Sequence, residues 1–220
     1  MKIELPVQIP SWIKESWEGQ FEVFPWYYFA IDLPSPIFII TTLKDNGLAN
    51  AQLSTWGMIA GSGNEPKFIL MVHNYTETRK LIEKTGEFVI NFPDISLKNK
   101  FRNTINPFDS NTDEIIASGL QHDKPLKVKA PRVKECFAHL ECKLDWIRDI
   151  EKETKSTSLV QGSIVHAAID ENVLSDDLKT TCENRKWVFN VHEMVNPKTG
   201  NHGTGFLTTL DMNSRVKIED

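Results

Sequence analysis

The chain has 220 residues, of which 40% are hydrophobic and 25% charged, so it is expected to fold as a globular protein rather than to be disordered. The formal net charge is −5, with 25 Lys and Arg against 30 Asp and Glu. This balance argues against duplex nucleic acid and acidic lipid surfaces as partners, because general polyanion binders are basic.

The first 35 residues are unusually aromatic, and Pro25 and Pro34 interrupt them. We expect an extended N-terminal arm over residues 1–35. Two interpretations remain open: the arm covers the domain of its own chain, or it reaches a partner subunit or a ligand.

Two strands are predicted next, joined by the turn Asp45-Asn46-Gly47. Residues 37–43 are apolar and β-branched, as in a strand covered on both faces. Residues 48–55 alternate, and one face carries the polar side chains Asn50, Gln52 and Ser54. That face either meets solvent or lines a ligand groove.

Residues 57–66 are rich in Gly, Ser and Asn and are expected to form a loop before a third strand at 68–72. Three strands in short succession indicate an antiparallel meander. A helix should follow, with Thr78 as its N-cap and Gly86 just past its end. A strand at 88–92 comes next.

The second half of the chain alternates polar segments with strands. Its expected elements are an insert at 94–131 with one or two short helices, strands at 137–146 and 158–169, a charged hairpin end at 148–155, a short helix within 173–182, and a C-terminal loop at 196–220. This order predicts a mainly β protein with helical additions, arranged as a barrel.

Few residue patterns point to chemistry of their own. Cys136, His139 and Cys142 resemble metal ligands by type, but strand parity puts His139 on the opposite face, so we interpret the cysteines as buried and structural. No Walker loop or dinucleotide glycine pattern occurs. An odd cysteine count, no leader pattern and no span of about 18 apolar residues favour a cytoplasmic protein without a membrane segment.

The predicted helix start is a candidate anion site. Asn74, Thr76 and Thr78 precede or begin the helix, and Arg79 and Lys80 fall in its first turn. A helix N-terminus offers free N–H groups and partial positive charge, which suit a phosphate. The alternative is that Thr78 only caps the helix and the cations are solvated.

The order of short motifs resembles one family. The sequence is similar to the flavin reductase-like, FMN-binding split-barrel proteins, closest to their flavoredoxin-type branch, over about residues 34–175. The matching features are Pro36–Thr42, the Asp45–Gly47 turn with Asn50, Ser54-Thr55-Trp56, Pro66, Thr78 with Ile82, Thr85-Gly86, Phe88–Asn91, Leu140–Cys142, Gly162 with Ile164, and Ile169–Leu174.

This resemblance implies an antiparallel split β-barrel over residues 36–195, with the arm at 1–35, the insert at about 94–131 and a tail at 196–220. It implies a homodimer with FMN near the subunit interface. The flavin would lie along Gln52, Leu53, Ser54 and Thr55. Its phosphate would lie at Thr78, with neighbours Asn74, Thr76, Arg79 and Lys80, and Asn91 is a further cofactor-binding candidate.

The resemblance also implies a function. The leading hypothesis is an FMN-binding oxidoreductase that passes electrons from NADH, NADPH or a protein donor to a small-molecule or protein partner. The alternative is a flavoredoxin-type electron carrier without turnover of its own. A third hypothesis is a barrel-fold interaction protein that binds no flavin.

Overall fold

The computed structural model describes residues 2–151, 154 and 156–211. The chain forms two compact units, the larger built on Pro36–Val188 and the smaller on residues 1–35 with Phe189–Thr208. Within the described part of the chain, no helix is long and apolar enough to cross a membrane.

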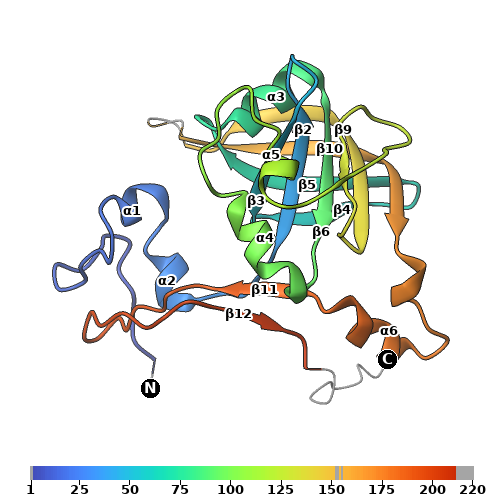
Figure 1. The fold of residues 1–220 in the computed structure, drawn as a ribbon. Helices are drawn as coiled ribbons and strands as arrows, with labels where there is room; N and C mark the ends of the chain where they lie inside the picture. The colour runs from blue at the N-terminus through green and yellow to red at the C-terminus, as the bar shows by residue number, and fades with distance from the viewer. Residues whose placement is uncertain (1, 152–153, 155, 212–220) are drawn as a thin grey trace. The chain divides into compact units, whose positions relative to one another are not determined.

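The larger unit is built on one seven-stranded antiparallel sheet (Figure 1), whose strands follow the order β3-β2-β6-β9-β10-β5-β4. The strands are β2 (Phe38–Leu43), β3 (Ala49–Ser54), β4 (Gly57–Ser62), β5 (Glu65–His73), β6 (Glu87–Phe92), β9 (Ala138–Asp149) and β10 (Thr157–Ile169). Apolar side chains from β2, β5, β6, β9 and β10 form a common core, among them Phe38, Phe68 and Phe88. The expected strands at 37–43, 48–55, 68–72, 88–92, 137–146 and 158–169 are therefore present.

The expected meander is wrong. β2 pairs with β3, but β5 pairs with β10 and β4, so β3 and β4 form the two edges of the sheet. The expected loop at 57–66 is also wrong, because its first part is strand β4. A Cβ on Gly57 would lie 2.7 Å from the rings of Phe38 and Phe68. Glycine here thus allows close packing against the core rather than marking a loop.

The expected helix is α3 (Glu77–Thr85), and it ends at Gly86 with φ of 69° as predicted. Its N-cap differs from the expectation. The side chain of Thr76 accepts the N–H of Arg79, whereas Thr78 lies inside the first turn and is buried. Both threonines are residue types that favour an N-cap, and the sequence alone does not determine which of them precedes the first helical residue.

The insert contains the expected short helices. The elements from 95 to 133 are η1 (Ile95–Leu97), α4 (Lys98–Asn103), α5 (Glu114–Ala117), β7 (His122–Asp123) and β8 (Arg132–Val133). Further on, η2 (Glu171–Val173) and α6 (Leu178–Arg185) replace the single helix expected at 173–182. In the expected hairpin end at 148–155, residues 152, 153 and 155 lie outside the described part.

The smaller unit corrects two expectations. The N-terminal segment is not simply extended, since it forms α1 (Gln20–Val23) and α2 (Tyr27–Ile31). Pro25 lies two residues before the first residue of α2, and the N–H of Tyr28 donates to its carbonyl at 2.8 Å. The tail is not all loop, because β12 (Phe206–Thr209) joins a sheet in the order β1-β11-β12 with β1 (Ser35–Pro36) and β11 (Val188–Val191). Residues 212–220 lie outside the described part.

Candidate functional site

A pocket of about 430 Å³ lies along the edge strand β3 of the larger unit. This volume is within the range of pockets that hold small molecules and cofactors. Its walls come from β3, the end of β5, the start of α3 and the insert. The lining residues are Asn50, Ala51, Gln52, Leu53, His73, Tyr75, Thr76, Glu77, Thr78, Thr104, Ile105, Asn106, Pro107, Phe108 and Glu114.

The outer edge of β3 faces this region with backbone donors. The N–H groups of Ala49 and Ala51 point away from β2 and donate to carboxylates at 3.2 and 2.9 Å. Hydrogen-bonding direction alternates along an antiparallel strand, so the N–H of Leu53 points to the same edge. No acceptor for it is seen among the residues that the structure describes. The pocket therefore includes a backbone donor available to a ligand.

Asn50 ties this strand to the helix. Its side chain is buried and donates to the hydroxyl oxygens of Thr78 at 2.8 Å and Thr42 at 3.1 Å. The polar face predicted for the strand is thus partly structural. Thr78 accepts from Asn50, and its own O–H remains able to donate.

The start of α3 has the features of an anion site. The backbone N–H groups of Glu77 and Thr78 have no partner within the helix, since the first turn lacks preceding carbonyls. Both residues line the pocket. The guanidinium of Arg79 pairs with Glu83, Lys80 is exposed, and neither residue lines the pocket.

Aromatic rings form another wall. The imidazole of His73 stacks on Tyr75 with ring centres 5.2 Å apart, and both residues line the pocket. Trp56, which lies outside the lining, packs edge-on against His73 at 5.4 Å. Burial lowers the pKa of His73, against the opposing charge of Glu151 and a hydrogen bond to Ser156. The ring is therefore held in its neutral form more strongly than a free histidine.

Four of the ten predicted site residues line the pocket: Gln52, Leu53, Thr76 and Thr78. Ser54 ends β3, Thr55 follows it, and Arg79 and Lys80 lie on α3 outside the lining. Asn74 instead donates to Asp149 and accepts from Ser158. These positions leave the predicted binding roles as predictions.

Asn91 has a structural environment. It is fully buried in β6, donates to the Ile39 carbonyl and the Thr41 hydroxyl, and accepts the N–H of Val133 at 2.9 Å. It also accepts from Nδ1 of His139 at 2.9 Å. These partners account for its side chain, and it does not line the pocket.

Sequence reasoning did not single out His73, Tyr75, Glu114 or the segment from Thr104 to Phe108 as parts of a site. His73 and Tyr75 stand at the strand end just before the predicted helix, which is a usable signal. The insert residues carried no such signal, because only the tertiary fold brings them to β3.

The cysteines have the buried environment that was expected. Cys136 and Cys142 are both buried, and burial raises the pKa of each thiol. Burial, followed by the charge of Arg132, lowers the pKa of His139 to about 4. No cluster of three or more metal-binding side chains occurs within the described ranges.

The larger unit thus holds an antiparallel sheet whose edge strands are β3 and β4, with a pocket along β3. The model of the flavin reductase-like domain matches residues 30–183, and the chain belongs to that family. The resemblance seen in the sequence is thus confirmed, as is the split-barrel fold.

Three solved structures illustrate the likeness. A flavin reductase-type protein with a split barrel domain from Shewanella frigidimarina has a TM-score of 0.70 and 21% identity, covering 88% of this chain and 91% of its own. Nitrilotriacetate monooxygenase component B from Bacillus cereus has a TM-score of 0.75 and 16% identity, covering 98% and 100%. Flavoredoxin from Methanosarcina acetivorans has a TM-score of 0.66 and 17% identity, covering 96% and 92%. At these identities the likeness establishes the fold alone.

Proposed function

We propose that this protein is an FMN-binding oxidoreductase that passes electrons from NADH, NADPH or a protein donor to a second redox partner. The observation that carries the proposal is the pocket itself. It combines the open edge of β3, the start of α3 and a wall of aromatic rings in one space of about 430 Å³. The family assignment makes a flavin the expected occupant.

The residues present fit such a group. A planar ring system needs a flat wall and in-plane hydrogen bonds, which the β3 edge with the Leu53 N–H supplies. A phosphate needs donors and positive potential, which the free N–H groups at Glu77 and Thr78 supply. The hydroxyl of Thr78 lies at the same helix start and can donate, whereas that of Thr76 donates to the carbonyl of His73.

When bound, FMN would supply reversible two-electron chemistry that no side chain of this protein has. The protein's own part is to bind, orient and enclose. Hydride transfer between stacked rings depends on their alignment more than on an acid or base, so the site needs no catalytic dyad. The neutral imidazole of His73 and the ring of Tyr75 add an aromatic surface without adding charge.

The as-isolated absorption spectrum tests flavin binding first. We expect a flavin spectrum, or its appearance when FMN is added and excess is removed. A protein that stays colourless and does not quench FMN fluorescence at micromolar concentrations would contradict the proposal and favour an interaction protein.

Turnover is tested by NADH or NADPH consumption with FMN present. Oxidation of either nucleotide above the rate with FMN alone supports an enzyme. Bound FMN without any nucleotide oxidation, combined with reduction by a protein donor, would identify the alternative, an electron carrier like the flavoredoxins.

A further inference from the structure

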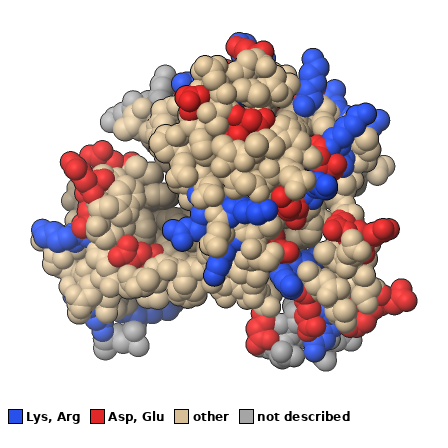
Figure 2. Space-filling view, viewed as in Figure 1, with Lys and Arg blue, Asp and Glu red and all other residues tan. Residues whose placement is uncertain are grey.

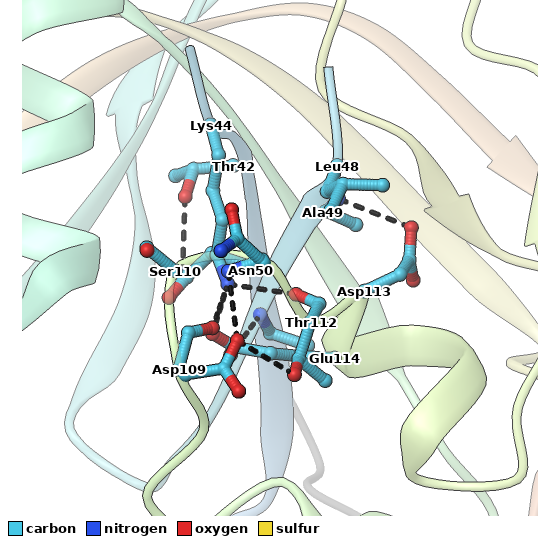
Figure 3. A network of polar contacts seen from close by, with 12 residues as sticks. Thr42, Lys44, Leu48, Ala49, Asn50, Asp109, Ser110, Thr112, Asp113 and Glu114 are labelled. Atoms are coloured by element: carbon cyan, nitrogen blue, oxygen red, sulfur yellow. Dashed lines mark hydrogen bonds and ion pairs between the residues drawn. The ribbon is translucent and has the colours of Figure 1, made fainter. Parts of the chain in front are cut away.

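A buried ion pair lies against the outer edge of β3 (Figure 3). Nζ of Lys44 is 2.8 Å from Oε1 of Glu114, and the two side chains are only 6% and 10% exposed. The same ammonium donates to the carbonyls of Thr112 at 2.8 Å and Asp109 at 3.3 Å. Lys44 therefore fixes both the Glu114 carboxylate and the insert that carries it.

The other oxygen of Glu114 accepts a backbone hydrogen bond that a carbonyl of a neighbouring strand would otherwise accept. Oε2 accepts the N–H of Ala51 at 2.9 Å. A carboxylate has about four lone-pair positions, and these two contacts use one on each oxygen. Glu114 also lines the pocket, and each of its carboxylate oxygens can accept a second hydrogen bond.

A donor lies beside this acceptor along the strand. Leu53 follows Ala51 by two residues, which places its outward N–H about 6.6 Å further along β3. Both Leu53 and Glu114 line the pocket. An acceptor and a donor on one edge match a ring that presents an N–H next to a carbonyl, which is the cyclic imide edge of an isoalloxazine.

We propose that Glu114 is a specificity-determining residue of the pocket, whose fixed carboxylate accepts the imide N–H of a flavin ring while the Leu53 N–H donates to the adjacent ring carbonyl. This inference rests on the proposed flavin function. It assigns to the insert the recognition of the ring edge, and to Lys44 the positioning of the carboxylate.

Asp113 provides a matched control. Its carboxylate holds the same strand edge through the N–H of Ala49 at 3.2 Å, and it accepts the N–H of Ile116 at 3.1 Å. It does not line the pocket. Asp113 thus shares the clamping role of Glu114 without access to the ligand.

The experiment compares two ligands, FMN and 3-methyl-FMN, in which a methyl group replaces the imide hydrogen. We expect the parent protein to bind FMN at least tenfold more tightly by fluorescence titration. The double variant Lys44→Met with Glu114→Leu removes the pair without leaving a buried charge. The affinities of this double variant for FMN and 3-methyl-FMN should agree within about threefold. The Asp113→Asn variant should keep the parent's ratio of these two affinities. Circular dichroism verifies the folding of each variant, and the comparison of the two ligands in the parent protein tests the imide contact without any variant.

Three results would overturn the inference. Equal affinities of the parent protein for FMN and 3-methyl-FMN would contradict the imide contact but not the proposed flavin function. This result does not require a folded variant. If the double variant keeps the parent's ratio of affinities for FMN and 3-methyl-FMN, groups other than Glu114 distinguish the two ligands. Loss of the ratio in Asp113→Asn would show that the clamp alone matters. Failure of the parent to bind either ligand would instead reject the proposed function, and the inference with it.

Discussion

Thr76 and Thr78 differ in what their hydroxyls contact, although either suits a helix cap. Thr76 caps α3 by accepting the N–H of Arg79. Replacing it with Ala should lower the free energy of unfolding by about 1 kcal/mol, since one first-turn donor loses its acceptor. Urea unfolding of the flavin-free protein measures this, with Thr76→Ser as the control that keeps the hydroxyl. A stability loss equal in both variants would argue against the cap.

His139 should make stability depend on pH. Burial lowers its pKa to about 4 in the folded chain, against an ordinary value of 6.5. Below pH 6.5 the unfolded chain therefore takes up a proton that the folded chain does not, and stability falls until the pH reaches about 4. The loss of stability is about 3.5 kcal/mol at most, at about 1.4 kcal/mol per pH unit.

Denaturant unfolding between pH 7 and pH 4 tests this assignment. His139→Gln removes the titrating group and should flatten the slope over that window. Gln can still donate to Asn91, which His139 contacts at 2.9 Å. If parent and variant lose stability in parallel, other groups cause the dependence.

At the scale of elements, Gly162 lets β10 pass close to the core. A Cβ at this position would lie 2.6 Å from the ring of Phe88 and 3.1 Å from the Lys143 carbonyl. The register between β10 and β9 also shifts between Gln161 and Gly162. Gly162→Ala should cost about 1–3 kcal/mol of stability through overpacking.

A double-mutant cycle checks the cause of that loss. In a Phe88→Leu background the smaller side chain leaves room, so the added cost of Gly162→Ala should be clearly lower. Equal costs in the two backgrounds would place the strain in the backbone rather than against the ring.

The sequence was most informative where burial and local pattern agree. Apolar runs such as 37–43 and 88–92 predicted strands because burial on both faces requires such residues. β4 was missed because Gly57 and Gly61 resemble loop residues, although one packs on aromatic rings and the other has φ of 90° in a turn-like conformation. The order of strands in the sheet depends on long-range pairing, which local pattern does not encode.

The candidate site was predictable only in part, for the same reason. β3 and the start of α3 carry visible polar patterns, and four predicted residues line the pocket. Glu114 and the segment from Thr104 to Phe108 come from an insert whose position depends on the buried Lys44 contact. No local spacing relates Lys44 to Glu114, because the two residues are 70 positions apart in the sequence and only the fold brings them together.

At the scale of the whole molecule, we predict a homodimer. The edge strand β4 exposes Met58 and Ile59 to 61% and 63%, and exposed apolar edge strands favour association. A stable interface should bury upwards of about 2,000 Å² in total. Light scattering should give about twice the chain mass of 25.2 kDa, and that single-chain mass at micromolar protein would contradict the prediction.

The distribution of surface charge favours binding of an anionic ligand at one local site rather than over an extended basic surface. Acidic and basic side chains are interspersed on the face seen in Figure 2. An anionic ligand would therefore depend on local donors, chiefly those at the start of α3, more than on an extended basic surface.

The measurement that tests the central claim most directly is a titration of the protein with FMN and with riboflavin, followed by flavin fluorescence. The two ligands share the isoalloxazine, so their difference isolates the phosphate and the helix start that should hold it. We predict that FMN binds at least tenfold more tightly, a difference of about 1.4 kcal/mol, and that Arg79→Gln with Lys80→Gln reduces this preference. Equal affinity for the two flavins would contradict a phosphate site at α3, and binding of neither would contradict the account as a whole.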